Sequence, residues 1–158
     1  MTAHYTSQHI KCLTGLAPVR TRPGNFTNVD NPLHLCIEIV DNAIDELKAC
    51  RSSAPISIEV TADGVISVSD QGRGIPFDTD GTGQSVLRSL CESLFSGGKF
   101  YTEGEESAYM TSAGLHGVGM GVVNALSTYF SVKVQRKRTV CQVTYTNGEF
   151  QSIMETTL

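Results

Sequence analysis

Hydrophobic positions between residues 33 and 50 recur every three or four residues, which is the spacing of the buried stripe of an amphipathic helix. The stripe consists of Leu35, Ile37, Ile39, Val40, Ala43, Ile44 and Leu47. Pro32 suits the first helical position, and Asp30 and Asn31 before it are candidate caps. The pattern therefore predicts one long helix that begins near Pro32, with a polar arc opposite the stripe.

A second pattern, strict alternation, covers residues 56–60 and 66–70 on either side of an Asp63–Gly64 turn signal. Alternation with a tight turn of this kind predicts a β-hairpin with one buried face. Asp70 has the same parity as the apolar residues of the second strand. The alternation therefore predicts a buried carboxylate at the end of that strand.

Weaker patterns divide the rest of the chain. Residues 1–31 are polar and rich in turn formers, so we expect an arm and connector there, followed by one domain over residues 32–158. Helical spacing returns over residues 84–95 and 114–127, and an acidic, glycine-bearing stretch between them predicts a mobile loop. Two strands, at 129–136 and 140–146, and an Asn147–Gly148 turn complete the pattern.

This order of elements predicts an α+β fold. Strands that follow one another directly favour a mixed, largely antiparallel sheet, and the separate helices favour a second layer on one of its faces. The strict strand–helix alternation of a Rossmann domain is absent from the pattern.

Composition narrows the class of protein. With 158 residues, 40% hydrophobic and 18% charged, the chain suits one globular domain. A net charge of −4 argues against direct binding of the nucleic-acid backbone by this chain. The five cysteines include no Cys-x-x-Cys pair, which favours reduced thiols in a cytoplasmic protein over a zinc or redox site. The start lacks a signal-peptide pattern, and no apolar run approaches the ~20 residues of a membrane span.

Glu38 and Asn42 are four residues apart in the predicted helix and therefore share a face. The carboxylate could accept a proton, and the amide oxygen could hold Mg²⁺, which prefers oxygen ligands and keeps several waters. A solvated polar face would show the same pattern.

Asp70 needs a partner if it is buried, because an unpaired internal carboxylate destabilises the fold. An adenine amino group or an ordered water would serve, and so would an internal arginine or a backbone cap. Gly72 and Gly74 just after it could form a simple turn or could let a flat ligand approach the backbone.

Four glycines, at positions 114, 117, 119 and 121, precede or open the predicted helix of residues 114–127. They match neither the Walker A pattern nor the dinucleotide fingerprint. Free N–H groups at a helix start favour anions, so a phosphate cradle is one interpretation and a flexible hinge is the other.

The order of these signals is more specific than any one of them. The stretches "EIVDNAIDE", "DQGRGIP", "GGKF" and "GLHGVGMGVVNALS" resemble the ATPase domain of bacterial type II topoisomerases, over nearly the whole chain. That domain is part of the wider ATPase group of gyrase, heat-shock chaperones, histidine kinases and mismatch-repair proteins. Residues 13–24 and 31–35 are similar to the topoisomerase IV branch, with the gyrase branch as the near alternative. The resemblance implies the two-layer Bergerat fold, with ATP and Mg²⁺ as cofactors.

The resemblance also implies a role for each matching residue. Glu38 would activate the attacking water, Asn42 would hold Mg²⁺, and Asp70 would accept the adenine amino hydrogen. Arg73 would cover the adenine edge and pair with Glu46. Further nucleotide contacts would come from Tyr5, Gly74, Ile75, Pro76, Lys99, Gly114, Leu115, His116, Gly117, Val118 and Gly119.

Beyond the pocket, the resemblance implies a part of a larger enzyme. The parent subunit would hydrolyse ATP to drive DNA strand passage, decatenation and relaxation, with an A subunit as its partner. ATP would dimerise two copies through the arm, and aminocoumarin antibiotics would bind beside Arg136. The chain ends before the strand whose threonine usually shares a water with the aspartate, so we expect a fragment with little turnover of its own. A nucleotide-regulated module without turnover is the alternative, whereas a histidine kinase is disfavoured because residues 1–31 resemble no dimerisation helix.

Overall fold

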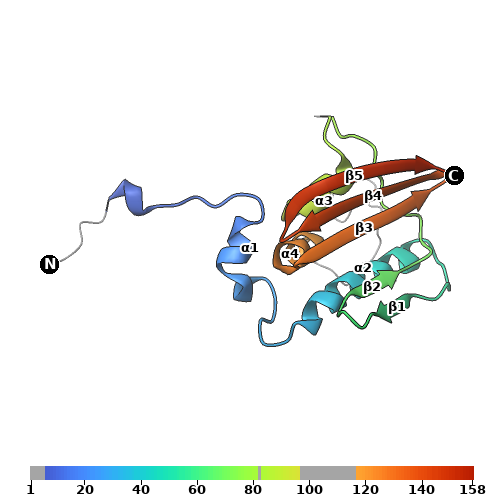
Figure 1. Ribbon diagram of the computed structural model, residues 1–158, viewed down its shortest axis with the longest axis horizontal. Coiled ribbons are helices and arrows are strands. Elements are labelled where there is room, and N and C mark those ends of the chain that lie inside the picture. Colours follow the sequence, from blue (N-terminus) through green and yellow to red (C-terminus); the bar gives the residue numbers. More distant parts are fainter. Residues whose placement is uncertain (1–5, 82, 97–116) are drawn as a thin grey trace.

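The computed structural model describes residues 6–81, 83–96 and 117–158 of the chain. The helices are α1 (Ala17–Thr21), α2 (Leu33–Ala49), α3 (Val86–Glu92) and α4 (Gly119–Leu126), with short 3-10 turns at Ser7–His9 and Pro23–Asn25. The strands are β1 (Ser57–Val60), β2 (Ile66–Ser69), β3 (Tyr129–Arg136), β4 (Thr139–Thr146) and β5 (Glu149–Thr157). Figure 1 shows the helices gathered on one side of the strands, with the N-terminal arm extending away from them.

The described strands form two antiparallel sheets, β1–β2 and β3–β4–β5. The predicted turn between β4 and β5 is confirmed, with positive φ at both Asn147 and Gly148. Two such residues in succession match the right-handed twist of the flanking strands. The predicted α+β class is therefore confirmed, with every described pairing antiparallel.

The hydrophobic core lies between the three-stranded sheet and the helices α3 and α4. Alternate residues of β3 and β4 point toward the helices, as the period of a strand requires. The buried cluster consists of Leu87, Cys91, Val123, Phe130, Val134, Cys141, Val143 and Tyr145. This packing fixes α4, whose first turn begins at the glycine-rich segment.

Helix α1 lies within residues 1–31, the stretch that the sequence predicts to be an arm and connector and for which it predicted no individual helix. Its Val19 is fully buried and packs with Val122 and Ala125 on the far side of α4. Helix α4 therefore lies between α1 and the sheet (Figure 1). A five-residue helix with a single buried side chain is too short to show helical periodicity in the sequence.

Helix α2 confirms the long helix predicted from the apolar stripe. The N-cap is Pro32, not the predicted Asp30 or Asn31, and it makes no side-chain cap bond, although the Asn31 side chain accepts a hydrogen bond from the Leu33 backbone N–H at 3.2 Å. Burial agrees with the predicted stripe at Ala43 and Leu47, whereas Ile37, also predicted in the stripe, is exposed. Asp45, expected on the polar arc, is fully buried.

The hairpin β1–β2 forms as predicted, but its burial was predicted wrongly. Ile58 and Val60 share one face of the hairpin and remain 55% and 69% exposed. Asp70, expected to be buried, is exposed as well. The physical reason is that alternation records which face is apolar and not whether another element covers it, and the apolar side chains of this hairpin belong to neither core cluster of the described residues.

Two smaller differences concern α3 and β5. The helix predicted over residues 84–95 is shorter, at Val86–Glu92, and the Ser85 side chain caps it by accepting the Arg88 N–H. Strand β5 was not predicted, because polar residues occupy much of both of its faces. Within the described residues, no helix is long and apolar enough to cross a membrane.

Candidate functional site

Helix α2 presents Glu38 and Asn42 one turn apart, and both are half-buried. The Glu38 carboxylate lies against Gly119 in the first turn of α4. In the described part of the chain this carboxylate accepts no hydrogen bond. An acidic group that is positioned but not engaged can take a proton from a bound water.

One turn further along α2, Glu46 holds Arg73, as the sequence predicts. The carboxylate accepts the Arg73 backbone N–H at 2.6 Å, Nε at 2.9 Å and Nη2 at 2.8 Å. The Glu46 side chain is 13% exposed and the Arg73 side chain 46%. The pair therefore ties the segment after β2 to α2.

The glycines after Asp70 are required by the protein itself. Asp70 accepts the Gly72 N–H at 2.8 Å, and a β-carbon at position 72 would collide with the side chains of Glu46 and Asp70. Gly74 has φ +73° and lies against β3, where a β-carbon would be 3.0 Å from the Gln135 carbonyl oxygen. Close packing thus explains why glycine occupies both positions without any need for a ligand. The same packing brings Asp70 close to the side of α2 that carries Glu46.

The predicted apolar floor is only partly buried. Ile75 is half-buried and packs against the core cluster, whereas Pro76 is exposed. Arg136 reaches the same region from β3, since its Cγ lies 3.2 Å from a β-carbon built at Gly74. Arg136 also lines a cavity of about 240 Å³, together with Phe77, Asp78, Lys137 and Thr139.

The glycine-rich segment is described from Gly117 onward. Gly117 has φ +58°, its carbonyl accepts the Ser96 N–H at 3.1 Å, and Val118 precedes the first turn of α4. The predicted nucleotide contacts Tyr5, Lys99, Gly114, Leu115 and His116 lie outside the described residues, as does nearly all of the predicted mobile loop.

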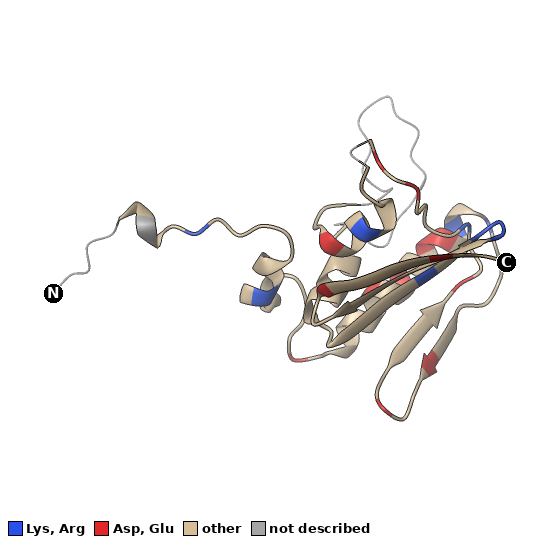
Figure 2. Ribbon diagram, turned by 45° about the horizontal axis from the view of Figure 1, so that its top comes forward, with Lys and Arg blue, Asp and Glu red and all other residues tan. Residues whose placement is uncertain are grey.

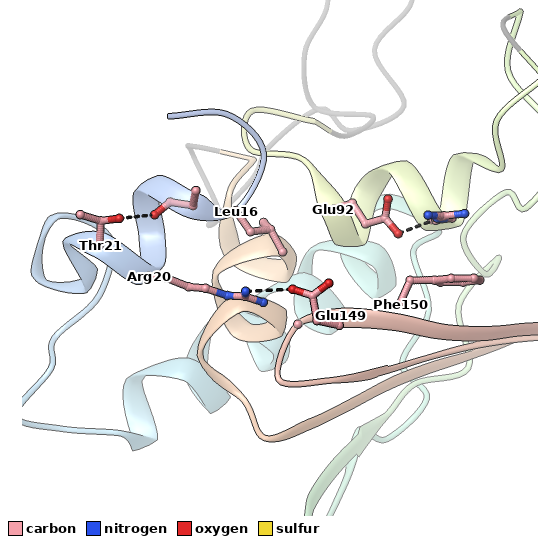
Figure 3. A pocket seen from close by; sticks show the side chains of 9 residues that line it. Leu16, Arg20, Thr21, Glu92, Glu149 and Phe150 are labelled. Carbon is pink, nitrogen blue, oxygen red and sulfur yellow. Dashed lines mark hydrogen bonds and ion pairs between the residues drawn. The ribbon is translucent and has the colours of Figure 1, made fainter. Parts of the chain in front are cut away.

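A larger cavity of about 480 Å³ lies elsewhere, between α1, α3 and the β4–β5 turn (Figure 3). Two ion pairs line it, Arg20 with Glu149 at 3.2 Å and Arg88 with Glu92 at 2.6 Å. Neither described cavity includes Glu38, Asn42 or Asp70 in its lining. Sequence reasoning did not identify this cluster, and the i,i+4 spacing of Arg88 and Glu92 was the one signal for it.

Charge is distributed without a grouping that suits a protein-only metal centre. Figure 2 shows the acidic and basic residues spread over the helices and strands, with basic residues at the β3–β4 turn. Within the described ranges, no three His, Cys, Asp or Glu side chains gather as metal ligands. A divalent ion here would therefore need oxygen atoms from a bound ligand in addition to protein atoms.

The comparison with known families identifies the family of the chain. The chain matches the family described as "Histidine kinase-, DNA gyrase B-, and HSP90-like ATPase" over residues 27–149, which is most of its length. The chain therefore belongs to this ATPase family. The matched segment contains Glu38, Asn42, Glu46 and Asp70 and both ends of the glycine-rich segment.

Within that family, the similar proteins are B subunits of type II topoisomerases. The chain is 42% identical over 146 residues to the DNA topoisomerase 4 B subunit of Francisella tularensis and 46% identical over 140 residues to the DNA gyrase B subunit of Synechocystis. These matches cover 92% and 86% of the chain but only 22% and 12% of the relatives. The chain thus spans a small part of the length of these relatives.

Solved structures give the same result for the fold. A topoisomerase IV ATP-binding domain of Francisella tularensis, in complex with a small-molecule inhibitor, matches with a TM-score of 0.70 and 36% identity, covering 90% of this chain and 64% of that one. The 43K ATPase domain of Thermus thermophilus gyrase B, in complex with an aminocoumarin, matches with a TM-score of 0.70 and 32% identity, covering 92% and 35%. The Bergerat-type fold predicted from the sequence is confirmed.

Proposed function

We propose that this chain binds ATP and serves as the ATPase domain of a type II topoisomerase B subunit. The observation that carries the proposal is the Glu38 carboxylate, which has no hydrogen-bond partner in the described chain and lies against the first turn of α4. The start of a helix favours phosphate, and a carboxylate beside it is placed to act on a water near that phosphate.

In this proposal, Glu38 and Asn42 of α2 have separate roles in ATP hydrolysis. Glu38 accepts a proton from the attacking water, which raises the nucleophilicity of its oxygen. Asn42, one turn away, holds Mg²⁺ through its amide oxygen, and the nucleotide phosphates supply the further oxygen ligands. When bound, Mg²⁺ neutralises phosphate charge. Positioning and charge neutralisation supply most of the rate enhancement in such reactions.

At the other end of the nucleotide, Asp70 would accept the adenine amino hydrogen. Its exposure and its position beside Gly72 and Gly74 leave the carboxylate accessible to a ligand. Arg73, held by Glu46, would cover the edge of the base. Ile75 and Pro76 would form the apolar floor of the pocket and contact the base.

Further contacts belong to the same proposal. Gly117, Val118 and Gly119 would wrap the phosphates together with Gly114, Leu115 and His116, and Lys99 would approach them from the preceding segment. Tyr5 would reach the nucleotide of a second copy, so that ATP binding dimerises two chains through the arm of residues 1–31, with residues 32–158 as the ATP-binding domain.

The parent protein, in this proposal, couples ATP hydrolysis to DNA strand passage, decatenation and relaxation. It would act with an A subunit in the cytoplasm and would contact DNA through parts other than this acidic chain. We favour the topoisomerase IV branch, with gyrase as the alternative. An aminocoumarin occupies the Thermus thermophilus relative, and Arg136 beside Gly74 is where such an inhibitor would contact this chain.

The test is the substitution Glu38→Ala in the full-length protein that carries this chain. We expect nucleotide affinity to persist while ATP turnover falls by about 100-fold or more, the usual contribution of a general base. Glu59→Ala, on the exposed strand β1, is the matched control and should retain turnover. Unchanged hydrolysis in Glu38→Ala would refute the proposed base. Nucleotide binding without turnover by the wild-type protein would favour a regulatory module instead.

A further inference from the structure

Gly119, the first residue of α4, is packed against the functional carboxylate of α2. A β-carbon built at position 119 would lie 2.7 Å from Oε2 of Glu38, and 3.4 Å from its Cβ. Real β-carbons essentially never approach another heavy atom closer than 3.0 Å. Any side chain at this position would therefore displace the Glu38 carboxylate.

The backbone itself does not require glycine here. Gly117 has φ +58°, a conformation that favours glycine, whereas Gly119 is a helical residue without a positive φ. In a helix, glycine is less favourable than alanine. Helix formation alone would thus favour alanine at position 119.

The nearby Gly121 shows the contrast. A β-carbon there would lie 2.8 Å from the backbone carbonyl oxygen of Ser93, so its obstacle is fixed main chain. At Gly119 the obstacle is the end of one side chain, and that carboxylate accepts no hydrogen bond from the described residues that would hold it. An added methyl group would therefore move the carboxylate and leave the helices in place.

We infer that Gly119 is a positioning residue that keeps the Glu38 carboxylate in its productive place. This inference rests on the proposed function, because it assigns Gly119 a role in turnover through Glu38. This role is additional to the proposed phosphate contact of Gly119, which would be made by its backbone N–H and would therefore persist in Gly119→Ala. The absence of a side chain at Gly119 thus leaves the space that the Glu38 carboxylate occupies.

The experiment uses four variants of the full-length protein: Gly119→Ala, Glu38→Asp, the two combined, and the control Gly81→Ala. A β-carbon at Gly81 would meet no atom within 4 Å. For each variant, kcat and KM for ATP, the Kd of a non-hydrolysable ATP analogue, and the urea unfolding midpoint are measured. Glu38→Asp shortens the side chain by one methylene and so withdraws the carboxylate from position 119.

We expect Gly119→Ala to lower kcat by about 10- to 100-fold, the cost of a misplaced catalytic group. The Kd should change by less than about 3-fold and the urea midpoint should stay equal or rise, since alanine favours the helix. In the Glu38→Asp background, the same alanine should change kcat by less than about 3-fold, because the steric conflict has been removed. Gly81→Ala should match the wild type.

Three results would overturn the inference while leaving the proposed function intact: full kcat in Gly119→Ala, an equal loss of kcat in both backgrounds, or a loss confined to Kd. A lower urea midpoint for Gly119→Ala would likewise overturn it, by marking Gly119 as a packing residue. Failure of the proposed function is recognised separately, because ATP turnover would then be absent from the wild type or insensitive to Glu38→Ala. Either of those results overturns both.

Discussion

At the scale of single residues, Glu46 holds Arg73 through a backbone N–H as well as through the guanidinium. Glu46→Ala should lower the free energy of unfolding by about 1–2 kcal/mol, since the Arg73 N–H and guanidinium both lose their acceptor, while solvent around exposed Arg73 offsets part of that loss. Arg73→Ala should cost less, about 1 kcal/mol, because the half-exposed guanidinium is partly screened and the backbone bond remains. Urea unfolding of the two variants measures the difference, and an equal cost would contradict it.

A second residue-scale prediction concerns alkaline pH. Burial raises the pKa of the Cys91 thiol from its ordinary value of 9.0 to about 12. The folded protein therefore holds a proton that the unfolded chain releases between these values, and stability falls as pH rises from about 9 to about 12, by at most ~1.4 kcal/mol per pH unit for this group. Below pH 9 this contribution is fully present.

The neighbouring Tyr145 hydroxyl acts in the same direction, because burial raises its pKa as well. Unfolding titrations at several pH values between 8 and 11 would measure the combined slope. Cys91→Ala should make that slope shallower, whereas the same change at exposed Cys12 should not. Identical slopes in all three proteins would refute the assignment.

At the scale of elements, α1 contributes to the fold mainly through Val19. Val19→Ala should lower the free energy of unfolding by about 1.5–3 kcal/mol, the range for lost transfer energy and a residual cavity at a fully buried site. Val29→Ala, at an exposed position, should change it by less than ~0.5 kcal/mol. A Val19→Ala variant as stable as the wild type would mean that α1 is a tether with no packing role.

Elements were predictable from the sequence where their pattern was long enough to repeat. Helix α2 has several turns of apolar spacing, and β3 and β4 alternate clearly, so all three were predicted. Helix α1 has too few turns for periodicity and β5 too few apolar residues for alternation, and both were missed. Periodicity measures which face is apolar, so it could not show that the apolar face of β1–β2 is exposed.

Some features of the candidate site were likewise predictable from the sequence, and others were not. The shared face of Glu38 and Asn42 follows from helical spacing, and the pairing of Glu46 with Arg73 follows from the resemblance. The contacts of Gly74 with β3 and of Gly119 with Glu38 join residues far apart in the chain, and spacing along the sequence does not encode such distances. The glycines were recognised as important, but their neighbours were not.

At the scale of the whole molecule, the two sheets differ in how many partner strands and covering helices stabilise them. Strand β4 is hydrogen-bonded on both sides and covered by α3 and α4, whereas β1 pairs only with β2 among the described strands and has exposed side chains. Backbone amides of β1–β2 should therefore exchange with solvent at least about 10-fold faster than those of β4, because local opening costs less there. Hydrogen exchange followed by mass spectrometry measures this, and equal protection would contradict it.

The meander β3–β4–β5 also has a consequence for how the chain is made. Its strands are joined by tight turns, so it can close rapidly once synthesised, with little loop entropy to overcome. It is, however, synthesised after the helices that it covers. Leu87 and Cys91 can be buried only after β3 and β4 have been synthesised. At about 5–20 residues per second, this takes several seconds. The first helices therefore emerge from the ribosome before the surface that will cover them exists.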